Sequence, residues 1–138
     1  MSLDHRQIAL VRESFRGIDQ TPTPVHRQFY ETLFRHDPKL RALFRADIES
    51  QGMSFMRTLR TILDNLERPE TLGERYGELG VGHQAVGVHR RDFDVMEDAL
   101  METLANALGE AWDDEVEAAW RAAYREIAAR MIAAGGIG

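Results

Sequence analysis

The 138-residue sequence contains no cysteine, which excludes disulfide bonds, thiolate metal sites and cysteine nucleophiles. No uninterrupted apolar run approaches the roughly 20 residues that a membrane span needs, so we expect no membrane partner. Basic residues number 17 against 23 acidic ones, and the resulting formal charge of −6 repels nucleic acid and anionic lipid. The first residues lack the layout of a secretory signal, so we expect a cytoplasmic protein.

Proline is also scarce, with four residues, and no segment alternates as a strand. Apolar residues instead recur at steps of three and four along the chain, which is typical of amphipathic helices. Residues 1–138 have the length of one domain, and 43% of them are hydrophobic, which is ordinary for a soluble globular protein. The sequence therefore predicts an all-α protein with about seven helices around a single core.

Capping and breaking residues predict where these helices begin and end. Side chains that bond free backbone amides mark starts, proline fits a first turn, and glycine follows a last turn. The predicted starts are Thr23-Pro24, Asp37-Pro38, Asp47 and Asp113, and the predicted ends are Gly17 and Gly109.

The segment at 73–83 is rich in glycine, and each glycine in a helix costs about 0.5–1 kcal/mol relative to alanine. Its apolar residues nevertheless keep helical spacing, and His83 continues the inward stripe of Tyr76 and Leu79. An inward histidine is most often an ordinary core residue. Burying an imidazole costs a few kcal/mol unless its nitrogens find partners, however, and the flanking residues are mostly Gly, Val and Ala. Haem iron is one partner that needs a single neutral imidazole.

The other histidines and the acidic runs indicate solvated surface. We expect His5, His26 and His36 to be solvent-exposed. The runs MEDALME at 96–102 and WDDEVE at 112–117 are expected to cap helices and to cover solvated faces.

Four stretches together resemble one protein family. They are HRQFYETLFRHDPKLRALF at 26–44, DIESQGMSFMRTL at 47–59, LGVGHQAVGVHRRDF at 79–93 and the ending GEAWDDEVEAAWRAAYREIAARMI at 109–132. In this order and spacing they resemble a bacterial single-domain globin, similar to the haem domain of flavohaemoglobins. The resemblance implies the globin fold and a haem b cofactor, iron protoporphyrin IX.

On the distal side of the haem, the resemblance places Tyr30 and Gln51 as hydrogen-bond donors. Dioxygen held there carries partial negative charge, so a phenol and an amide stabilise it more than carbon monoxide and slow its release. Phe55 lies one turn beyond Gln51, where the family more often has leucine, and would narrow the pocket. The alternatives are a surface-reaching phenol for Tyr30 and a solvent-facing side chain for Gln51.

On the proximal side, the resemblance makes His83 the iron ligand. Phe44 matches the phenylalanine that stacks on the haem ring, although an ordinary core anchor is the alternative. We expect Val88, Phe93 and Met96 to contact the haem as well.

Besides Phe55, three positions depart from the flavohaemoglobin pattern. In that type a tyrosine and a glutamate increase the donor strength of the proximal histidine, and the corresponding residues here are Phe93 and Gly135. His83 would therefore bond a backbone carbonyl, as in oxygen-carrying globins. Ser54 replaces a lysine that often lies near a haem propionate, which leaves the propionate partners open.

The sequence thus predicts a haem globin that binds dioxygen reversibly, as a carrier, store or sensor, and that also binds NO and CO. An enzymatic alternative is nitric oxide dioxygenation, with electrons from a separate reductase. A second alternative is a haem-free helical module that binds a protein partner. The oligomeric state, a homodimer included, stays open.

Overall fold

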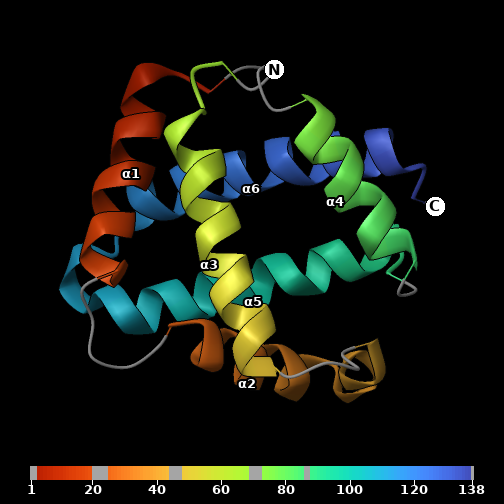
Figure 1. Ribbon diagram of the computed structural model, residues 1–138. Helices are drawn as coiled ribbons and strands as arrows, with labels where there is room; N and C mark the ends of the chain where they lie inside the picture. Colours follow the sequence, from red (N-terminus) through yellow and green to blue (C-terminus); the bar gives the residue numbers. More distant parts are fainter. Residues whose placement is uncertain (1–2, 20–24, 44–47, 69–72, 86–87, 138) are drawn as a thin grey trace.

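The computed structural model describes residues 3–19, 25–43, 48–68, 73–85 and 88–137, and these are helical apart from short connections, with no strand among them (Figure 1). The all-α prediction is therefore confirmed. The helices of the described residues are α1 (His5–Asp19), α2 (Val25–His36), the 3-10 helix η1 (Pro38–Leu43), α3 (Ile48–Asp64), α4 (Gly73–Ala85), α5 (Arg90–Leu108), the 3-10 turn η3 (Gly109–Ala111) and α6 (Asp114–Gly135).

Two of the predicted helix boundaries follow from local chemistry. Asp113 caps α6, and its carboxylate accepts a hydrogen bond of 2.8 Å from the backbone N–H of Val116. Gly109 follows α5 with a φ of 57°, a conformation that glycine adopts without strain. These two predictions are confirmed.

The start predicted at Asp37-Pro38 is confirmed as well. The 3-10 helix η1 begins at Pro38, and the Asp37 carboxylate accepts a hydrogen bond of 3.1 Å from the backbone N–H of Lys39. The starts predicted at Thr23-Pro24 and at Asp47 lie outside the described residues.

The predicted end of the first helix at Gly17 is wrong. Helix α1 continues to Asp19, and the residue after Gly17, Ile18, is buried in the main core. Burial of a side chain of this size stabilises by about 1.5–3 kcal/mol, which exceeds the cost of one helical glycine. The tertiary contact therefore extends the helix beyond the point that glycine alone predicts.

Helices α1 and α4 both pack on α6, each in a different region along its length (Figure 1). The most extensive contact between helices joins α4 to α6, and the next joins α2 to α5. Helix α3 packs on α2 and α1 instead. Within the described part of the chain, α3 and α4 have little direct contact with each other.

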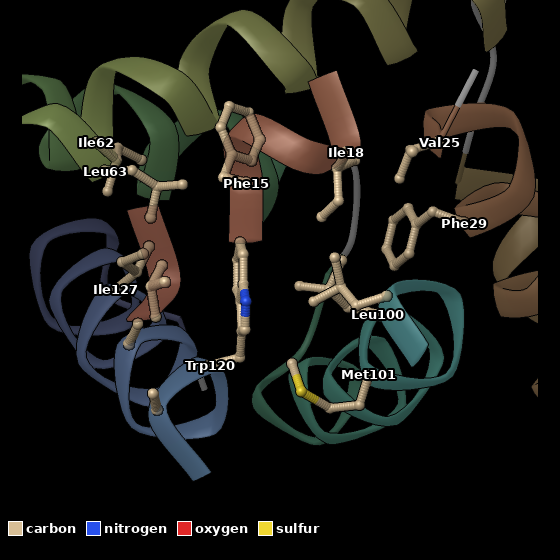
Figure 2. Packing of buried hydrophobic residues seen from close by; sticks show 14 of the residues in the cluster. Phe15, Ile18, Val25, Phe29, Ile62, Leu63, Leu100, Met101, Trp120 and Ile127 are labelled. Atoms are coloured by element: carbon tan, nitrogen blue, oxygen red, sulfur yellow. The ribbon is translucent and has the colours of Figure 1, made fainter. Parts of the chain in front are cut away.

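The main core lies where α1, α3, α5 and α6 meet. Trp120 of α6 points toward Phe15 of α1, with Leu63 and Leu100 on its two sides (Figure 2). The indole N–H donates to the hydroxyl of Ser14 at 2.8 Å, so this large side chain is buried without an unsatisfied polar group. None of the described helices is long and apolar enough to cross a membrane.

Candidate functional site

Tyr30 lies on α2 and is 6% exposed, so its phenol is buried and does not reach the surface. Its ring stacks against Phe34 with centroids 6.1 Å apart and lies tilted against Phe29 at 5.4 Å. Burial raises the pKa of Tyr30 to about 12 because the phenolate would lose its hydration. The hydroxyl therefore stays protonated at neutral pH and can act as a hydrogen-bond donor.

The other two predicted distal residues belong to α3. Gln51 lies in its first turn and Phe55 one turn later, on the helix that packs on α2, which carries Tyr30. The side chains of Gln51 and Phe55 are outside the described part of the structure, and so is the whole of Phe44. Their roles stay predictions.

His83 lies near the end of α4, so the glycine-rich segment does form the predicted helix. Tyr76 on the same helix is buried and Leu79 is half-buried against the main core, which agrees with the predicted inward stripe up to Leu79. The side chain of His83 is outside the described residues. Because four glycines weaken α4, we attribute its stability to the extensive contact with α6.

A second, smaller hydrophobic cluster connects the end of α6 with the start of α5. Val88 and Phe93 are buried in it, and Met96 packs against it, so the structure brings these three predicted residues together. The cluster also contains Ala128 and Ile137. The side chains of this cluster are apolar, as are most side chains around a bound cofactor.

Tyr124 of α6 was not assigned to the site from the sequence, yet it packs against this second cluster. Its hydroxyl donates to the backbone carbonyl of Phe93 at 2.7 Å and joins α6 to the first turn of α5. Burial raises the pKa of Tyr124 well above its usual value, and nearby carboxylates, that of Glu97 first, raise it further. Helical spacing predicts that Tyr124 points inward from α6. It does not identify the carbonyl on α5 that accepts the hydrogen bond from its hydroxyl.

Two predictions of solvated residues are wrong. His26, in the first turn of α2, is 8% exposed and therefore buried. Glu97 is 6% exposed and lies between α5 and α6, where Arg121 donates to it at 2.6 Å and Arg125 at 3.1 Å. A buried carboxylate requires such partners, and here both come from the neighbouring helix.

The predicted distal and proximal residues lie on helices that have different main partners. Helix α2, which carries Tyr30, packs most extensively on α5 and also contacts α3 and η1, whereas α4 packs on α6. Among the described residues, α3 and α4 have little contact with each other.

Known proteins are similar to this chain over most of its length. A model of the globin family matches residues 27–131. The chain is 26% identical over 133 residues to the flavohemoprotein of Deinococcus radiodurans, covering 94% of this chain but only 33% of that protein. It is 28% identical to leghemoglobin-1 of Vicia faba, covering 97% of this chain and 100% of that protein.

Solved structures with similar folds also align with nearly the whole chain. An engineered carbene transferase from Rhodothermus marinus, provisionally described as a nitric oxide dioxygenase, superposes with a TM-score of 0.88 at 20% identity over 98% of this chain and 94% of that one. A bacterial globin from Campylobacter jejuni gives 0.84 at 19% identity, with 96% of each chain covered. At these identities the likeness establishes the fold alone.

Proposed function

The chain belongs to the globin family and has haem as its cofactor, and from this premise we propose that it binds dioxygen reversibly beside Tyr30. Ferrous haem supplies the capacity to bind small diatomic gases. The residues of this chain determine how long each gas stays and which gas is favoured. The proposed role is therefore that of an oxygen carrier, store or sensor.

The described residues fit a haem. On one side, Tyr30 is a buried, protonated phenol on an otherwise aromatic surface of α2. On the other, Val88, Phe93 and Met96 belong to or pack against one apolar cluster beside α4, the helix that contains His83. In this proposal His83 holds the iron, and Phe44, Gln51 and Phe55 complete the pocket.

The observation that carries the proposal is the burial of Tyr30. A protonated phenol in a low-dielectric pocket stabilises a partly negative ligand such as dioxygen and does little for carbon monoxide. A hydrogen bond to a charged group contributes about 1.5–3 kcal/mol. Loss of such a bond in Tyr30→Phe should therefore speed dioxygen release roughly ten- to a hundredfold.

The decisive experiment combines absorption spectroscopy with stopped-flow kinetics on the purified protein. We expect a Soret band that changes among the ferric, ferrous and carbonmonoxy forms and that is altered in His83→Ala. Tyr30→Phe should speed dioxygen release while carbon monoxide release stays within about twofold of wild type. An unchanged spectrum and haem content in His83→Ala would refute the proximal assignment, and a colourless protein after expression with added haem would favour a haem-free interaction module.

Nitric oxide dioxygenation is a second candidate, supported by the relatives named flavohemoprotein. The chain spans 33% of the Deinococcus radiodurans relative, so any electrons would come from a reductase outside the matched region. Phe93 has no hydroxyl that could polarise the proximal histidine, which favours simple binding over oxygen–oxygen bond chemistry. Sustained nitrate production from NO with NADH and an added reductase would favour the enzyme, whereas a single stoichiometric reaction favours the carrier.

A further inference from the structure

Helices α4 and α6 touch backbone to backbone at two glycines, Gly80 and Gly135, both of which are buried. A Cβ placed on Gly80 would lie 2.3 Å from the carbonyl oxygen of Met131 and 2.7 Å from the Cα of Gly135. A Cβ on Gly135 would lie 2.3 Å from the carbonyl carbon of Gly80. Real Cβ atoms essentially never approach other atoms within 3.0 Å, so neither position accepts alanine without movement of a helix.

This requirement for glycine is steric and not conformational. Among the described residues only Gly109 and Gly136 have positive φ, so Gly80 and Gly135 have backbones that any residue can adopt. Gly77, one turn before Gly80 on α4, is different, because a Cβ added there would meet no neighbouring atom within 4 Å. The restriction is therefore specific to the position of Gly80 and does not apply to α4 as a whole.

The contact lies close to the predicted iron ligand. Gly80 precedes His83 by three residues, about 4.5 Å along the helix axis and less than one turn. Relieving a 2.3 Å approach to an ordinary 3.4 Å contact requires a shift of about 1 Å at Gly80. A rigid helix transmits such a shift to His83, and a misplacement of about 1 Å at a reacting group can change rates a hundredfold.

We propose that Gly80 and Gly135 are positioning residues that set the depth of α4 on α6 and thereby the position of the His83 imidazole. The inference rests on the proposed role of His83 as the haem ligand. It also gives a physical reason for one departure from the flavohaemoglobin pattern. The backbone of Gly80 occupies the space that a side chain at position 135 would need, so a glutamate cannot be restored there without displacing α4.

The test compares Gly80→Ala and Gly135→Ala with the matched control Gly77→Ala in the haem-loaded protein. The readouts are the iron–histidine stretching frequency of the ferrous, ligand-free form by resonance Raman and the rate of haem transfer to an excess of apomyoglobin. We expect a shifted frequency and at least tenfold faster haem loss in Gly80→Ala and Gly135→Ala, with Gly77→Ala unchanged. If both test variants match wild type in frequency and haem loss, the inference is overturned.

A variant that fails to fold can be distinguished from one that folds but holds haem poorly. Gly135 is the last residue of α6, so Gly135→Ala disturbs α6 only at its end and carries the test if Gly80→Ala does not fold. If the wild-type protein takes up no haem, the proposed function fails on its own. Thermal unfolding of the apoproteins then tests the contact: Gly80→Ala should unfold at a lower temperature than Gly77→Ala, and equal temperatures would overturn the inference.

Discussion

The tyrosines give the sharpest prediction, because all three in the chain have pKa values raised above the usual value near 10. Burial raises the pKa of Tyr30 to about 12. It also raises the pKa of Tyr76, where the nearby Arg130 opposes part of the effect, and that of Tyr124. In the folded protein we therefore expect Tyr30 and Tyr124 to stay almost fully protonated at pH 10, where about half of the tyrosines in an unfolded chain are ionised.

This difference makes stability depend on pH in a defined direction. Between about pH 10 and 12 the folded state keeps the Tyr30 proton that the unfolded state releases, so the free energy of unfolding falls as pH rises. The stabilisation is complete below pH 10 and is lost progressively up to about pH 12. A pKa difference of about two units corresponds to roughly 2–3 kcal/mol for Tyr30 alone.

The assay is a titration of the apoprotein at 295 nm from pH 8 to 12, followed in parallel by far-ultraviolet circular dichroism. We expect the part of the tyrosinate absorbance that comes from Tyr30 to rise only near pH 12, or together with loss of helix. Urea unfolding at pH 9 and pH 11 should show the loss of stability, and Tyr30→Phe should show a smaller one. A tyrosine that ionises near pH 10 in fully helical protein, and whose signal disappears in Tyr30→Phe, would refute the assignment of Tyr30 as a buried phenol.

Three substitutions test the packing around the site by urea unfolding. Asp113→Ala removes the cap bond to Val116 and should lower the free energy of unfolding by about 1 kcal/mol, whereas Asp113→Asn should restore most of it; equal losses would contradict the capping role. Tyr124→Phe removes the bond to the Phe93 carbonyl and should cost about 0.5–1.5 kcal/mol, and no loss would mean that water replaces the hydroxyl without penalty. Leu33→Ala empties a site that is 0% exposed and should cost about 2–5 kcal/mol; a cost below 1 kcal/mol would show that the core collapses around it.

Features that depend on neighbours in sequence were predicted well. The ends at Gly109 and Asp113 follow from the conformation of one residue and from one side chain bonding an amide three residues on. The inward direction of Tyr30 follows from helical spacing, and the structure places it in the main core. Val88 and Phe93 are buried in one cluster, and their predicted contact with haem stays a prediction.

Features that depend on a second helix were not predicted. His26 and Glu97 both lie on helices with polar neighbours, and nothing in their local sequence distinguishes them from solvated residues. Their burial arises from the packing of helices against one another, for Glu97 that of α5 against α6. For Glu97 the partners Arg121 and Arg125 lie more than 20 residues away in the sequence, a separation from which no spacing rule predicts contact.

In α4 the spacing of the apolar residues favours a helix, whereas the glycines disfavour one, and the contact with α6 decides the outcome. Gly77 and Gly80 carry the same intrinsic cost in a helix, but only Gly80 permits the close approach to α6. A helix with weak propensity forms where packing stabilises it, so the partner that stabilises α4 also determines its position. In our proposal, the position of His83 is therefore set by the contact that Gly80, three residues earlier on the same helix, makes with α6.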